Sequence, residues 1–149
     1  MTDATKPALD LTRRSPFTHW IDIQIRYNDQ DTLGHINNVV YSAYLEHARC
    51  DLLYGLGYAK AYPRLEFVIV RAEIDFRVEI NYPGTIQVGS VLTRTGRTSF
   101  DLCHGMFSPG SEVCHSTAKS VLAWFDLDTR KTTAPPADMA AKLEAFRAP

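Results

Sequence analysis

Cysteine, an excess of charge of either sign and long apolar runs are all scarce in this sequence, and each scarcity has a consequence. Three cysteines, Cys50, Cys103 and Cys114, cannot all pair and show no C-x-x-C spacing, which favours reduced thiols. Sixteen basic residues against seventeen acidic ones leave a formal charge of −1, which argues against a nucleic-acid partner. The apolar runs are much too short for a membrane span, and the first residues contain no apolar signal core. We therefore expect one cytoplasmic domain with no membrane span and no nucleic-acid partner.

Several catalytic and metal-binding patterns are also missing. No G-x-S-x-G or H-E-x-x-H segment is present, which disfavours a nucleophile-elbow serine hydrolase and a zincin. A two-residue turn at Pro109-Gly110 would place His104 opposite His115 on neighbouring strands, yet no third ligand is evident. We predict neither a metal nor a cofactor.

The order of apolar patterns predicts a strand, a long helix and then four strands. Residues 18–27 alternate between apolar and polar side chains, and the loop at 28–38 is dense in Asn, Asp and Gly. An apolar stripe at helical spacing follows, with Asn37 or Asn38 as its N-cap and Gly55 or Gly57 at its end. The stripe consists of Tyr41, Tyr44, Leu45, Ala48 and Leu52. Further strands are predicted at 65–80, 85–98, 99–107 and 112–128, with a short helix at 137–146.

Pro-Gly turns between the last strands favour antiparallel neighbours. The simplest fold is α+β, an antiparallel five-stranded sheet wrapped around one long central helix. Residues 1–16 are expected to form a flexible N-terminal tail, and residues 17–149 a single domain. One helix cannot cover both faces of such a sheet, so a second copy of the chain is expected to cover the other face if that face is apolar.

The loop before the long helix contains the parts of an acyl-transfer site. Asp31 lies seven residues before Asn38, and Gly34 between them permits a sharp turn. The first turn of a helix has unpaired N–H groups that stabilise an oxyanion, and a nearby carboxylate attacks a carbonyl or activates water. On spacing alone, however, the sequence favours Asp31 and Asn38 as ordinary loop and cap residues, because loops rich in Asn and Asp are common before helices.

Residues 26–49 read R-Y-x-D-x-D-x-x-G-H-I-N-N-x-x-Y-x-x-Y-x-E-x-A-R. This segment resembles the signature of hot-dog fold acyl-CoA thioesterases of the 4-hydroxybenzoyl-CoA thioesterase-like group. The resemblance continues through FVIVRAEIDFRVEINYPG and GRTSF and covers roughly residues 18–128. It implies a hot-dog fold, thioester hydrolysis, an acyl-CoA substrate in which coenzyme A is not a separate cofactor, and a homo-oligomer, at least a dimer and by family a tetramer.

The resemblance also implies roles for particular residues. Asp31 matches the catalytic carboxylate, as nucleophile or general base, and the backbone N–H of Asn38 matches the group that polarises the thioester carbonyl. Gly34 would let the acyl group pass close to the chain. The turn Arg97-Thr98-Ser99, with Arg94 beside it, matches the region that binds the CoA phosphates.

Three further residues are weaker candidates. His35 is expected to orient substrate or water, or simply to pack in the loop. Glu46 is a backup catalytic acid, although we expect it to pair with Arg49 three residues later on the helix. Tyr41 belongs to the apolar stripe, and its hydroxyl is a candidate to reach the acyl tunnel.

Two other functions remain open. Asp31 and His35 are the pair that a hot-dog hydratase or dehydratase would need. A non-catalytic acyl-thioester-binding module is the third hypothesis, although a fold alone does not require the D-x-D-x-x-G-H-x-N-N segment.

Overall fold

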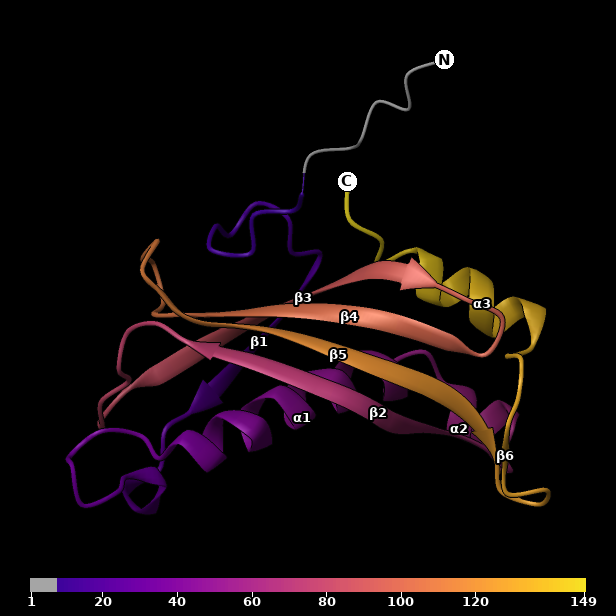
Figure 1. The fold of residues 1–149 in the computed structure, drawn as a ribbon, viewed down its shortest axis with the longest axis horizontal. Helices are drawn as coiled ribbons and strands as arrows, with labels where there is room; N and C mark the ends of the chain where they lie inside the picture. The colour runs from indigo at the N-terminus through magenta and orange to yellow at the C-terminus, as the bar shows by residue number, and fades with distance from the viewer. Residues whose placement is uncertain (1–7) are drawn as a thin grey trace.

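The computed structural model describes residues 8–149, in which a curved antiparallel sheet lies across one long helix (Figure 1). Helix α1 spans Asn38–Tyr54, and the strands are hydrogen-bonded in the order β1-β3-β4-β5-β2. This arrangement confirms the predicted α+β hot-dog architecture. The strands are β1 His19–Gln24, β2 Leu65–Phe76, β3 Thr85–Thr95, β4 Ser99–Phe107, β5 Cys114–Asp126 and the two-residue β6 Lys131–Thr132, which pairs with β5. The shorter helices are η1 Tyr27–Asp29, α2 Tyr58–Ala61 and α3 Ala137–Glu144.

Helix α1 begins and ends where capping chemistry predicts. The side chain of Asn37 accepts a hydrogen bond from the backbone N–H of Val39 at 2.9 Å, so Asn37 rather than Asn38 is the N-cap. Gly55 ends the helix. All five residues of the predicted apolar stripe are buried, which explains why the helix lies on the sheet. Among the described residues, no helix is long and apolar enough to span a bilayer.

A row of polar side chains divides the core beneath α1. One apolar cluster joins the first half of α1 to the sheet, and a second joins its last turns to the sheet and α3. On three strands and on α1, one buried polar residue lies between members of the two clusters. We call this row the polar seam: Arg49, Ser90, His104 and Ser120.

The opposite face of the sheet is partly covered by the N-terminal segment of the same chain. Gly89 and Gly105 are directly opposed on β3 and β4, and a Cβ on either would lie under 3 Å from the Phe17 ring. The two glycines therefore form a flat surface for Phe17, and Leu9 and Leu11 pack nearby. Of the segment predicted as a tail at 1–16, residues 1–7 lie outside the described part of the chain, and Leu9 and Leu11 pack against this face of the sheet.

The predicted boundaries and pairings were wrong in several places. Strand β2 ends at Phe76 rather than at residue 80, and η1, α2 and β6 were not predicted because they are too short for a periodic pattern. His104 is opposite Ala118 rather than His115, because a register shift lies between Met106 and Phe107 and the connection is longer than two residues. The expected direct ion pair between Glu46 and Arg49 is not formed, although the charge of Glu46 acts to raise the pKa of Arg49; Arg49 Nη1 donates to Ser120 Oγ at 3.3 Å.

Candidate active site

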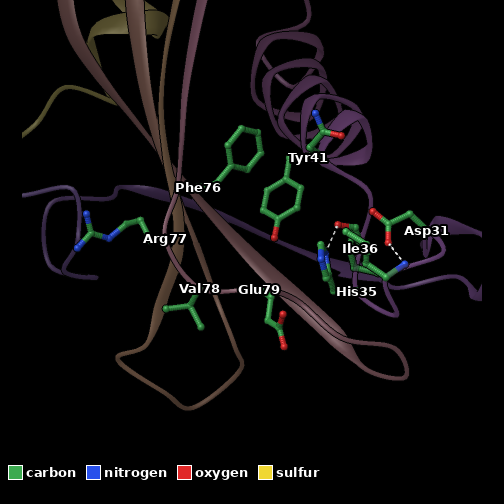
Figure 2. A pocket seen from close by; sticks show the side chains of 10 residues that line it. Asp31, His35, Ile36, Tyr41, Phe76, Arg77, Val78 and Glu79 are labelled. Atoms are coloured by element: carbon green, nitrogen blue, oxygen red, sulfur yellow. Dashed lines mark hydrogen bonds between the residues drawn. The ribbon is translucent and has the colours of Figure 1, made fainter.

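A cavity of about 370 Å³ lies between the loop that precedes α1 and the segment that follows β2 (Figure 2). Four residues singled out from the sequence line it: Asp31, His35, Asn38 and Tyr41. The remaining walls are Leu33, Ile36, Phe76, Arg77, Val78 and Glu79. The sequence pattern did not indicate the last four of these, because a strand end carries no periodic sign of the loop it will face.

Asp31 is held in a tight turn at the edge of this cavity. Its Oδ1 accepts a hydrogen bond from the backbone N–H of Leu33 at 2.8 Å, and its backbone N–H donates to the carbonyl oxygen of His35 at 3.0 Å. Gly34 has φ +85°, a left-handed conformation that glycine adopts without strain, and it closes the turn without lining the cavity. Within the described residues, Asp31 Oδ2 accepts no hydrogen bond. The carboxylate is therefore half-buried, oriented, and has one oxygen available to a ligand.

The N-terminus of α1 borders the same cavity. Asn37 accepts the N–H of Val39 through its side chain and the N–H of Val40 through its carbonyl oxygen. The amide of Asn38, the remaining N–H of this first turn, has no hydrogen bond among the described residues. An unpaired N–H at the first position of a helix is a donor with partial positive charge. It can donate to an oxygen that develops negative charge in the cavity.

Asp29, the other carboxylate of the D-x-D pair, is buried in a network behind the loop. Its Oδ1 accepts hydrogen bonds from Arg26 Nη2 at 2.8 Å and Arg26 Nε at 3.1 Å. Its Oδ2 accepts from the backbone N–H of Arg26 at 2.9 Å and from the Tyr44 hydroxyl at 2.7 Å. Burial alone would raise the pKa of this carboxyl, but the donors from Arg26 and Tyr44 outweigh it and hold the pKa below its ordinary value. Asp29 is therefore ionised and fully paired, and it does not line the cavity.

The aromatic wall of the cavity comes from α1 and the end of β2. The rings of Tyr41 and Phe76 pack edge to face with centroids 5.1 Å apart, and Figure 2 shows both between the helix and the strand. Burial raises the pKa of Tyr41, so its hydroxyl is protonated at neutral pH. His35 Nδ1 lies 3.2 Å from the carbonyl oxygen of Ile36, which leaves Nε2 as the ring nitrogen without a hydrogen bond in the described chain.

The other predicted site residues lie away from this cavity within one chain. Glu46 is exposed and lines a separate groove between α1 and β2. Arg94, Arg97, Thr98 and Ser99 lie around the turn between β3 and β4, at the opposite end of the 11-residue strand β3. At about 3.3 Å per residue, β3 is roughly 30 Å long, and this length separates the β3–β4 turn from the end of the sheet next to the cavity. Arg94 Nη2 donates to Asp101 Oδ1 at 2.7 Å and to Ser99 Oγ at 3.1 Å, while Arg97 is exposed.

No group of three or more His, Cys, Asp or Glu side chains in residues 8–149 is arranged to hold a metal ion. His104 and His115 are separate groups: His104 Nδ1 lies 2.8 Å from Ser90 Oγ, and His115 Nε2 lies 2.8 Å from Ser108 Oγ.

Comparisons with known proteins agree with this architecture. The PA5185 protein of Pseudomonas aeruginosa superposes with a TM-score of 0.85 at 23% identity, over 91% of this chain and 96% of that one. YbaW, a probable thioesterase of Escherichia coli, gives a TM-score of 0.75 at 25% identity, over 85% and 97% of the two chains. A Thermus thermophilus thioesterase complexed with coenzyme A and Zn gives a TM-score of 0.75 at 24% identity, over 88% and 95%.

Sequence comparison gives a family but no individual relative. No curated protein sequence matches the chain. The model of the thioesterase-like superfamily matches residues 25–143, which include the loop, α1 and all the later strands. The chain therefore belongs to the thioesterase-like superfamily.

Proposed function

We propose that the protein hydrolyses an acyl-CoA thioester to a free acid and coenzyme A, with Asp31 as the reacting carboxylate and the backbone N–H of Asn38 as the oxyanion donor. The observation that carries this proposal is that Asp31 and Asn38 line one cavity, while Asp31 Oδ2 and the backbone N–H of Asn38 have no hydrogen bond among the described residues. Membership of the thioesterase-like superfamily supports the reaction class.

The chemistry needs few groups because a thiolate is a good leaving group. The Asn38 amide hydrogen-bonds the carbonyl oxygen and stabilises the negative charge that develops on it. Asp31 then either removes a proton from a water molecule that attacks the carbonyl carbon, or attacks that carbon itself to form an anhydride that water hydrolyses. In both routes the C–S bond breaks, the thiolate takes a proton, and one water is consumed. His35, on the same wall, is suited to orient that water.

The substrate carrier is proposed to be coenzyme A, with no separate cofactor. The fold shared with a thioesterase complexed with coenzyme A supports this choice. We keep the β3–β4 turn as the phosphate-binding region: Arg97 is exposed, whereas Arg94 is largely occupied by Asp101. Because this turn is far from Asp31 within one chain, phosphate binding there requires a second copy to bring the two regions together.

A homo-oligomer, at least a dimer and by family a tetramer, is therefore part of the proposal. Strand β2 is at an edge of the sheet, where its outer backbone groups have no strand partner among the described residues. Ile69 and Val70 on this strand are 49% and 63% exposed. Light scattering coupled to gel filtration measures the mass of the assembly, and a monomeric mass would contradict the proposed oligomer.

The three cysteines are free thiols, as we expect for a cytoplasmic protein.

The test of the function is thiol release from a panel of short, long and aromatic acyl-CoAs by the purified protein. Hydrolysis of at least one class is expected, and no release across the panel would favour a non-catalytic binding module. One observation favours a hydratase as the second candidate, namely that Asp31 and His35 line the same cavity. A change in enoyl absorbance with enoyl-CoA or 3-hydroxyacyl-CoA, without thiol release, would establish it.

A further inference from the structure

The buried carboxylate of Asp29 connects the two halves of the candidate active site. Asp29 is 1% exposed and accepts four hydrogen bonds, from Tyr44 on the second turn of α1 and from Arg26 after the end of β1. Its own carbonyl oxygen accepts the backbone N–H of Asn37, the N-cap of α1, at 2.9 Å. One residue thus contacts the strand end, the helix side and the helix cap.

These contacts determine where the reacting groups lie. Asn37 is adjacent to Asn38, so the bond from Asn37 to Asp29 sets the position of the Asn38 amide. Asp31 follows Asp29 by two residues and begins the turn that closes at His35. Loops are ordinarily mobile, yet a small displacement of a reacting group has a large kinetic cost.

We propose that Asp29 is a positioning residue for thioester hydrolysis: it holds the turn that carries Asp31 at a fixed distance from the backbone amide of Asn38. This inference rests on the proposed function. Asp29 does not line the cavity, so it acts through Asp31 and Asn38. Tyr44 contributes through its hydroxyl, which bonds the same carboxylate.

The test compares two pairs of near-isosteric variants. Asp29→Asn and Tyr44→Phe weaken the Asp29 network, whereas Glu66→Gln and Tyr58→Phe weaken an analogous contact between the hydroxyl of buried Tyr58 and a carboxylate, near the other end of α1. We expect Asp29→Asn to lower kcat by about tenfold or more, and Tyr44→Phe by several-fold, with KM within twofold of the wild-type value. The Glu66 and Tyr58 variants are expected to retain wild-type kcat per folded molecule, even if their melting temperatures fall as far as those of the Asp29 and Tyr44 variants.

A second readout does not depend on turnover. In a ¹H–¹⁵N NMR spectrum, the amide resonances of Leu33 and Asn38 are expected to shift in Asp29→Asn and Tyr44→Phe and to stay in place in the control pair. Unmoved resonances, or an equal loss of kcat in the control pair, would overturn the positioning role. If the wild-type protein hydrolyses no acyl-CoA, the proposed function fails separately, and the NMR shifts still decide whether Asp29 positions the two groups.

Discussion

Two buried polar groups in this protein differ in how completely they are paired. At the junction of the loop and α1, the Asp29 carboxylate accepts four hydrogen bonds and lies against a guanidinium. In the polar seam, His104 bonds Ser90 through Nδ1 only, and its Nε2 is the one buried side-chain nitrogen or oxygen without a partner among residues 8–149. Arg49 in the same seam reaches one hydroxyl at 3.3 Å and forms no ion pair within the described chain.

The difference concerns where exact geometry is needed. A fully paired buried network is rigid, because moving any member leaves a desolvated charge unpaired. The junction carries both proposed reacting groups, so rigidity there has a catalytic use. The seam lies between two apolar clusters that already hold α1 on the sheet, so incomplete pairing costs stability without displacing the site.

The largest expected effect on stability follows from removing the fully paired group. Asp29→Ala leaves the Tyr44 hydroxyl and the Arg26 amide without their acceptor, and we expect the free energy of unfolding to fall by about 3 kcal/mol. Arg26 is mostly exposed and regains water, which keeps the loss at the lower end for a buried pair. Urea denaturation at pH 7.5 measures it. A loss below about 1 kcal/mol would show that the junction is not a rigid network.

The seam is expected to make stability depend on pH. Burial lowers the pKa of His104 to about 3, and the nearby charges of Arg49 and His19 act in the same direction. Below about pH 6.5, His104 therefore takes up a proton in the unfolded chain but stays neutral in the folded chain. Its titration costs the folded state no stability above about pH 6.5, and the free energy of unfolding falls progressively as pH drops toward about 3. Between pH 7.5 and 4.5 the loss is expected to be about 2–3 kcal/mol.

His104→Leu is the control for this pH effect. It removes the titrating group and the unpaired nitrogen while filling the space, so the loss of stability between pH 7.5 and 4.5 should shrink by about 2–3 kcal/mol. Urea denaturation of both proteins at several pH values provides the comparison. Parallel pH profiles would show that His104 is not the group responsible.

The smallest expected effect concerns the backbone of the turn that joins Asp31 to His35. Gly34→Ala puts a side chain on a residue with φ +85°, where no atom would contact the new Cβ. The cost is therefore the left-handed conformation alone, about 1 kcal/mol. A melting temperature equal to that of the wild-type protein would indicate that the turn adopts another conformation in solution.

The sequence predicted the elements whose patterns are local. The stripe from Tyr41 to Leu52 and the Asn-rich cap identified α1, and alternation with Pro-Gly turns identified the main strands. Pairings that depend on the length of a connection and on an inserted residue were not predictable: the longer β4–β5 connection and the register shift beside Phe107 together placed His104 opposite Ala118. The packing of Phe17 on Gly89 and Gly105 was also missed, because nothing in a short polar segment indicates which face it will cover.

The candidate site was predictable to the extent that it lies in one continuous segment. Asp31, His35, Asn38 and Tyr41 fall within eleven residues, and the structure places all four on one cavity. Its other wall, Phe76 to Glu79, comes from a distant segment that is joined to the loop by the backbone N–H of Ile36, which donates to the carbonyl oxygen of Ile80 at 2.8 Å. The burial of Asp29 was likewise hidden, since sequence spacing does not show which of two neighbouring carboxylates turns inward.

Thiol release by wild-type protein and Asp31→Asn, measured side by side on the best acyl-CoA of the panel, tests the central claim most directly. Asp126→Asn is the matched control, because the Asp126 carboxylate also accepts backbone N–H groups of a tight turn, but far from the cavity. We predict that Asp31→Asn lowers kcat by at least about 100-fold while its free energy of unfolding is unchanged, and that the kcat of Asp126→Asn stays within twofold of the wild-type value. Undiminished hydrolysis by folded Asp31→Asn would contradict the account.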